Sequence, residues 1–441
     1  MGDRYTDHLN ALNNTTLANA TISTTPSGTQ TIAFADGGIS DAFGRFRVSN
    51  PVTLFDSKQL YDKAPLFWDE ETSGGGETSV HSTVNAATTM TVAAASGEYV
   101  IRQTFMRTNY QPGKSQQILF TFNMGAGTAN VQKRIGYFNT STTPPYTANI
   151  DGIFLEQEGT TLNIVQSQNG SREAVPQSSW NVDPFDGTGP SQVTLDISKA
   201  QILIMDFEWL GVGRVRVGFI IDGKIYYAHY FNNANTKETV YMSSPNHSVR
   251  YEIRSMGGTD SMDHNCSSVT SEGGENQVGH LHYVSTGGTH LDAATENTDY
   301  ALILLRLKES NIDSVTKLVG KNVALHTASS FAEWKLIFNP AVDSSGTLTW
   351  NNVDNSSMQY ALGGTAHTVT GGETVDGGFF ESGDGGMGAS AGGSTGVTSV
   401  NALTLGAGIS GVRDTWGLVV RPIGGSSAID VEGSIQWREL V

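Results

Sequence analysis

The feature that most constrains the fold is a long alternation of short β-type runs with turn signals, from Val80 to about Thr298. Runs such as YVIRQTFMRT, SQQILFTFNM and SVRYEIRS are rich in Thr, Val and aromatic residues, and the segments QPGK, DGTGP and DGK separate such runs. Helical periodicity is nearly absent from this stretch. The pattern predicts an all-β fold of two β-sandwich, jelly-roll-like domains preceded by an extended N-terminal arm.

Composition excludes several classes of protein. The chain has 441 residues, which suits two β-rich domains, and its single cysteine excludes a disulfide framework or a Cys-rich metal site. No apolar run approaches the roughly 20 residues that span a bilayer, and the first residues show no secretory signal. The net charge, 26 − 43 = −17, disfavours nucleic acid as a partner.

Changes in composition predict four segments. Residues 1–40 carry too few large apolar groups to fold alone, so we expect an arm that becomes ordered on another subunit or remains a disordered terminus. Residues 41–78 form an aromatic docking segment that ends in a Gly-rich linker, ETSGGGET. Residues 79–298 form the first β-sandwich and 299–441 the second, which contains a Gly-rich loop at 371–396.

The docking segment is dense in aromatic side chains, and its prolines break any helix that would span it. We expect these side chains to contact a partner or a neighbouring domain. They are Phe43, Phe46, Phe55, Tyr61, Phe67 and Trp68.

The stretch QILIMDFEWLGVGRVRVGFIIDGKIYYAHYF predicts three antiparallel strands. Apolar residues alternate along each strand, and the sets must share one face of the sheet. This requirement pairs Trp209 with Val215 and Phe207 with Val217, and Asp222-Gly223 is a type I′ turn signal.

On the opposite face this register gathers two acids and two arginines. Glu208 would lie opposite Arg216, with Asp206 and Arg214 beside them, as a surface salt-bridge ladder. Two carboxylates two residues apart also occur in some sandwich-fold glycoside hydrolases, so a catalytic pair is the alternative. The ladder is the favoured interpretation.

Candidate metal ligands are sparse. His280 and His282 lie two residues apart, so an extended strand would place both imidazoles on one face. One such pair is a weak motif. The sequence also lacks the His-Glu-x-x-His motif of metalloproteases and the P-loop of nucleotide-binding proteins. We therefore predict no metal, no cofactor and no enzymatic activity.

Four long phrases resemble a family of virion structural proteins of tailed bacteriophages, notably marine ones. They are DAFGRFRVSNPVTLFDSKQLYDKAPLFWDE, FMRTNYQPGKSQQILFTFNM, SSWNVDPFDGTGPS and ILIMDFEWLGVGRVRVGFIIDGKIYYAHYFNN, all within residues 37–275. The resemblance implies a component of the phage particle and supplies no catalytic or cofactor residue.

These observations predict a structural component on the outside of the virion, a head decoration, head fibre or tail fibre, made in the host cytoplasm. It would attach to other virion proteins through its N-terminal region and assemble as a homotrimer. The alternative is a glycan-binding receptor-recognition module or a capsular polysaccharide depolymerase that contacts host surface glycan. Aromatic candidates for sugar stacking are Trp180, Trp334, Trp350 and Trp437.

Overall fold

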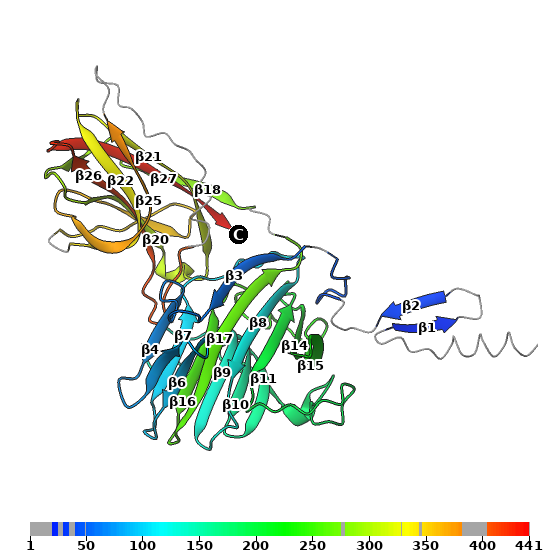
Figure 1. Cartoon of the computed structure of the whole chain (residues 1–441). Helices are drawn as coiled ribbons and strands as arrows, with labels where there is room; N and C mark the ends of the chain where they lie inside the picture. The colour runs from blue at the N-terminus through cyan, green and yellow to red at the C-terminus, as the bar shows by residue number, and fades with distance from the viewer. Residues whose placement is uncertain are drawn as a thin grey trace, which may run out of the picture.

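In the computed structural model, the described residues fold almost entirely into antiparallel β-strands (Figure 1). The structure describes residues 20–24, 30–34, 40–48, 50–274, 278–327, 329–343, 346–381 and 404–440. Within them the helices are two 3₁₀ turns, η1 (Gln177–Ser179) and η2 (Glu309–Asn311). No described helix has the length and hydropathy required to cross a bilayer.

The first domain is a sandwich of two large sheets. The seven-stranded sheet contains, in spatial order, β12 (Ser171–Pro176), β11 (Thr161–Gln168), β10 (Asp151–Glu158), β9 (Val131–Asn139), β16 (Val249–Ser255), β7 (Tyr99–Thr104) and β4 (Trp68–Thr72). The eight-stranded sheet contains β15 (Lys224–Asn232), β14 (Arg214–Ile221), β13 (Gln201–Phe207), β8 (Gln116–Asn123), β17 (Asp260–Ser271), β6 (Ala87–Val92) and β5 (Thr78–Ser82), with β3 (Val52–Lys58) paired to β17.

The second domain also has two sheets. In the four-stranded sheet, β27 (Ile429–Leu440) pairs with β21 (Val315–Leu325) on one edge, and with β18 (His280–Ser285) and β19 (Leu291–Ala293) on the other. The six-stranded sheet contains β23 (Asn351–Asn352), β24 (Met358–Leu362), β20 (Tyr300–Leu307), β26 (Thr415–Ile423), β22 (Phe331–Val342) and β25 (Val369–Glu381).

Each domain has its own hydrophobic core, which confirms the all-β sandwich prediction. The first core draws its side chains from residues 55–269 and the second from residues 284–437. The predicted domain boundary at residue 299 is wrong, because β18 and β19 already pair with β27 of the second domain. The strongly apolar strand β20 suggested a later start, while the polar strand β18 carried little signal.

The N-terminal arm is only partly described. β1 (Ala20–Thr24) and β2 (Gln30–Phe34) form a two-stranded hairpin, which Figure 1 shows to one side of the first domain. The rest of residues 1–39 lies outside the described residues, as does 382–396 of the predicted Gly-rich loop. The first part of that loop is not a loop, because it lies within β25 and pairs with β22.

The aromatic segment 41–78 is part of the first sandwich, which corrects its interpretation as a docking segment. Phe55 and Trp68 are 4% and 3% exposed within the first core, and Phe67 packs against them. Their strands, β3 and β4, pair with β17 and β7, so these rings are needed for the domain's own core.

The remaining docking candidates are more accessible, and the predicted linker is an ordered turn. Phe46 and Tyr61 are 52% and 87% exposed, while Phe43 is half-buried beneath the guanidinium of Arg45, 4.6 Å from the ring centre. The Gly-rich stretch joins β4 and β5, which belong to opposite sheets of the same sandwich. The Glu77 carboxylate accepts hydrogen bonds from backbone N–H groups of this turn.

The predicted register of β13 and β14 is shifted by two residues. Phe207 lies opposite Val215, and Asp206 lies opposite Arg216. An even shift keeps every side chain on its predicted face but changes its partner. Trp209 lies outside β13, because residues 208–213 form the loop that connects β13 to β14. Leu210 and Gly211 in this loop take positive φ angles.

The charged face is buried, which contradicts the predicted surface ladder. Asp206 and Arg216 have side chains that are 0% exposed, and Arg216 donates to both carboxylate oxygens from Nε at 2.6 Å and Nη2 at 2.9 Å. Arg47 also pairs with this carboxylate, and Tyr227 donates its hydroxyl to it. Burial and the Asp206 charge raise the pKa of Tyr227 well above its usual value, so the phenol keeps the proton that it donates.

Residues 40–47 exclude water from this network. The carbonyl oxygen of Ser40 accepts from Arg216 at 2.7 Å, and that of Ala42 accepts from Arg214 at 2.9 Å. Glu208 stays half-buried, and its carboxylate accepts from the backbone N–H of Arg214 at 3.0 Å.

We predict unequal effects for the two acids that the sequence treats alike. Asp206→Asn leaves buried guanidinium groups without a compensating charge and should lower the free energy of unfolding by about 3–5 kcal/mol. Glu208→Gln keeps an acceptor for the Arg214 N–H and should cost at most about 1 kcal/mol. Chemical denaturation followed by tryptophan fluorescence measures both, and equal small costs would show that the buried pair does not stabilise the domain.

Candidate functional site

A cleft of about 610 Å³ lies between the two domains. Its walls come from loops at the ends of strands of both sandwiches and from the last residues of β27, so neither domain forms it alone. The first domain contributes Asn109, Tyr110, Pro112, Trp209, Pro245 and Asn246, and the second contributes Lys308, Asn311, Asp313, Ser314, Asn355, Ser356, Ser357, Glu439 and Leu440.

The two walls are joined by the segment that precedes β26. Arg107 of the first domain, 3% exposed, donates from Nη1 to the carbonyl oxygen of Ala407 at 2.6 Å. The N–H of Ile409 donates to Oδ2 of Asp69 at 2.7 Å, and the Asn246 amide donates to the carbonyl oxygen of Asp313 at 3.3 Å. Burial lowers the pKa of Arg107 to about 10, so its guanidinium is still charged at neutral pH.

The first-domain wall presents fixed aromatic rings. Tyr110 stacks on Phe207 with ring centres 5.8 Å apart, and its hydroxyl oxygen accepts from the N–H of Trp209 at 2.9 Å. The Trp209 indole donates to the carbonyl oxygen of Met242 at 3.1 Å and remains half-buried. Burial raises the pKa of Tyr110 to about 12, so this phenol is neutral at physiological pH.

The second-domain wall contains a carboxylate that is already engaged. Glu439, 4% exposed, accepts from the Ser356 hydroxyl, from the Ser357 N–H at 3.0 Å and from the Trp437 indole at 3.0 Å. Burial alone would raise its pKa, but these hydrogen bonds outweigh that effect and lower the pKa. Glu439 is therefore an ionised acceptor and not a proton donor at neutral pH.

Three other polar side chains of the cleft make no hydrogen bond within the described part of the molecule. Within the described residues, no hydrogen bond is made by the side chains of Asn109, Asp313 or Asn355, which are half-buried or exposed. An amide offers two donors and an acceptor, and a carboxylate offers acceptors only. The cleft can thus bind a neutral ligand rich in hydroxyl groups beside an aromatic surface.

The candidate pair His280 and His282 is not part of a group of three possible metal ligands within the described residues. His280 is exposed, and His282 stacks on Trp437 with ring centres 5.6 Å apart. The nearest carboxylate, Glu439, lies 3.9 Å from the His282 Nε2 and is occupied by the donors described above. The group of three possible ligands in the described part of the chain contains a different histidine, His290.

The four tryptophans proposed for sugar stacking lie elsewhere. Trp180 and Trp437 are 5% and 1% exposed and belong to the two cores. A cation covers one face of each of the others, with Lys321 4.4 Å from the Trp334 ring centre and Arg306 3.7 Å from that of Trp350. Sequence reasoning missed the residues of the cleft because they come from distant segments and share no local motif.

We predict a pH-dependent role for Glu439 in stability. Its pKa in the folded protein lies below the ordinary value of about 4.3, so its contribution is complete above that pH and is lost as the pH falls below it. Glu439→Gln should cost about 2 kcal/mol at pH 7, and this difference should shrink toward pH 3. Unfolding curves at several pH values measure the difference, and a cost that is the same at pH 7 and pH 3 would exclude an ionised Glu439.

No family model and no curated protein sequence matches the chain. Among solved structures, it is similar to the carbohydrate recognition domain of Emp47p (12% identity, TM-score 0.31, 50% of this chain and 96% of that chain). It is also similar to a legume lectin-like domain from Entamoeba histolytica (7% identity, TM-score 0.30, 50% of this chain and 98% of that chain). A third similar structure is the catalytic domain of an endo-1,3-beta-glucanase from Thermotoga petrophila RKU-1 (14% identity, TM-score 0.33, 51% of this chain and 98% of that chain). Similarity at this level says nothing about function. The chemistry of the cleft is therefore the basis for a functional proposal.

Proposed function

We propose that the chain is a glycan-binding protein and that the cleft between its domains is the recognition site. The observation that carries the proposal is the combination of the half-buried Trp209 ring with the unengaged side chains of Asn109, Asp313 and Asn355 in one cleft. Its volume of about 610 Å³ lies within the usual range of ligand sites, roughly 300–1,000 Å³.

The chemistry of the cleft matches that of a sugar. A pyranose ring presents C–H groups that pack on an aromatic surface, and its hydroxyl groups both donate and accept hydrogen bonds. The amides of Asn109 and Asn355 can satisfy both roles, and Asp313 can accept from two neighbouring hydroxyls. Two hydrogen bonds, from the Trp209 backbone N–H to the Tyr110 hydroxyl and from the Trp209 indole to the Met242 carbonyl oxygen, hold the aromatic wall in place before binding, which reduces the entropy lost on binding.

The electrostatics favour binding over hydrolysis. A glycosidase that uses two carboxylates needs one of them protonated, with a raised pKa, to donate to the leaving oxygen. In the cleft the pKa of Glu439 is lowered, and its oxygens accept from Ser356, Ser357 and Trp437. We therefore propose recognition without cleavage, which agrees with the expectation from the sequence that the chain is not an enzyme but differs from its main prediction of a structural virion component.

The test is binding of the purified chain to a panel of immobilised microbial and host glycans. Asp313→Asn and Asn109→Ala should each weaken binding to the best glycan about tenfold or more, because the first replaces one carboxylate acceptor with a donating NH2 group and the second removes an amide, and neither change empties a core. Asp56→Asn is the matched control, since Asp56 is 59% exposed and does not line the cleft. Undiminished binding by both cleft variants would exclude the cleft, and no binding by the wild type to any glycan would remove the proposal.

A second candidate function is the one implied by the resemblance to phage virion proteins, a trimeric component of the particle exterior. The N-terminal hairpin β1–β2 favours it, because the described sandwich strands do not pair with the hairpin. Residues 40–47, next along the chain, are fixed to the first domain through Ser40, Ala42 and Arg47. Such an arm could attach the body to other virion proteins, and a cleft on the body could then contact host glycan.

We predict that deletion of residues 1–39 separates attachment from folding. The shortened chain keeps residues 40–47 over the buried network and should unfold at the same denaturant concentration as the full chain. It should no longer assemble into particles. A longer deletion, through residue 48, removes the Arg47 contact to Asp206 and should also destabilise the body. Full occupancy of the particle by the first variant would place the attachment elsewhere.

A further inference from the structure

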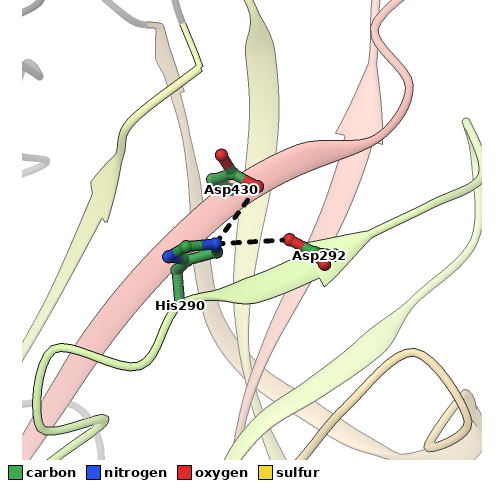
Figure 2. Close-up of side chains that lie close together, drawn as sticks. All are labelled: His290, Asp292 and Asp430. Carbon is green, nitrogen blue, oxygen red and sulfur yellow. Dashed lines mark ion pairs between the residues drawn. The ribbon is translucent and has the colours of Figure 1, made fainter.

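A histidine and two aspartates lie together on the sheet surface of the second domain (Figure 2). Asp292 of β19 and Asp430 of β27 are direct partners across the antiparallel pair, and His290 immediately precedes β19. The Nε2 atom of His290 lies 3.5 Å from Oδ1 of Asp292 and 3.7 Å from Oδ1 of Asp430.

The three groups are poorly satisfied by one another. Like charges directly opposite across a strand pair repel, which disfavours the position of Asp292 against Asp430. Both imidazole–carboxylate distances exceed the usual 2.7–3.2 Å of a hydrogen bond. Within the described residues, these side chains make no hydrogen bond to any other group, so their nitrogen and oxygen atoms remain available.

The spacing matches the requirement of a small cation. Ligands about 2.0–2.1 Å from a tetrahedral zinc ion lie about 3.3 Å apart. One ligand atom from each of the three residues lies within 4.8 Å of the others, and two of the separations are 3.5 and 3.7 Å. The side chains are 51%, 63% and 40% exposed, so small rotations can bring all three to an ion.

We propose that His290, Asp292 and Asp430 form a divalent transition-metal site of the zinc class. One imidazole with two carboxylates is a donor set that zinc accepts, whereas calcium and magnesium prefer oxygen atoms alone. Three protein ligands leave a coordination position open to an oxygen atom of water or of a bound molecule. The ion would neutralise the two opposed aspartates and fasten the three-residue strand β19 to β27.

The backbone positions the ligands. The N–H of Asp430 donates to Oγ1 of Thr327 at 2.8 Å, and its carbonyl oxygen accepts from the N–H of His326 at 2.9 Å. The neighbouring residues Gly288 and Glu432 line a polar hollow of about 170 Å³, so the site lies beside a surface that can receive a ligand.

The test is titration of the full chain, freed of metal by a chelator, with zinc chloride. Calorimetry should show one ion bound per chain, and zinc should raise the melting temperature, because the ligands come together only in the folded state. Cobalt(II) should give the visible absorption of a four- or five-coordinate ion. Magnesium and calcium at the same concentration should do neither.

Variants assign the site. His290→Ala and Asp430→Asn should each weaken zinc binding at least about tenfold, and the exposure of both residues predicts that the variants fold. His280→Ala is a control for an exposed histidine on the same sheet. His326→Ala tests the neighbouring pair, in which the His326 Nε2 lies 3.5 Å from the Glu432 carboxylate. Loss of binding in His326→Ala with retention in His290→Ala would overturn the assignment, as would a wild-type chain that zinc neither binds nor stabilises.

Discussion

The buried guanidinium of Arg107 joins the two domains, and the shape of the cleft depends on it. It donates to the carbonyl oxygens of Phe105 in its own domain and Ala407 in the other, at 2.7 and 2.6 Å. Beside it, Asp69 accepts from the N–H of Ile409, whose side chain packs with Tyr99, Ile101 and Tyr146 of the first domain. Hydrogen bonds from a charged group are strong and directional, so this contact holds the two domains together beside the cleft.

Buried charge is a recurrent device in the first domain. On the seven-stranded sheet, Glu252 is 0% exposed and pairs with Arg134, Arg250 and Arg254 at 2.7–2.8 Å. Burial would raise the Glu252 pKa, but the three guanidinium groups hold it well below its usual range. Only 16% of the residues in the chain are charged. The ion pairs of Glu252 and the Asp206 network bury some of these residues inside the protein. Removing one partner of such a group leaves the other charge buried without compensation, so each of these positions tolerates only a partner that compensates it.

Local patterns predicted the fold class, while long-range contacts determined the rest. The alternation in β13 and β14 correctly placed Phe207 and Val215 on the core face, since a strand has a period of two residues. The turn signal at Asp222-Gly223 is confirmed, because both residues take positive φ angles and Ile221 lies opposite Lys224 across the turn. The burial of Asp206 was not predictable from this pattern, because the segment that covers it begins at Ser40, far away in the sequence. The cleft was not predictable for the same reason, because Trp209 and Asp313 come together only when the two domains pack against each other.

The most direct test of the account is hydrogen–deuterium exchange with and without the glycan that the chain binds best. Binding in the cleft should slow exchange on both walls at once, in residues 109–110 and 245–246 of the first domain and in residues 311–314 and 355–357 of the second. Protection in only one domain, or on surfaces away from these segments, would contradict an interdomain glycan site.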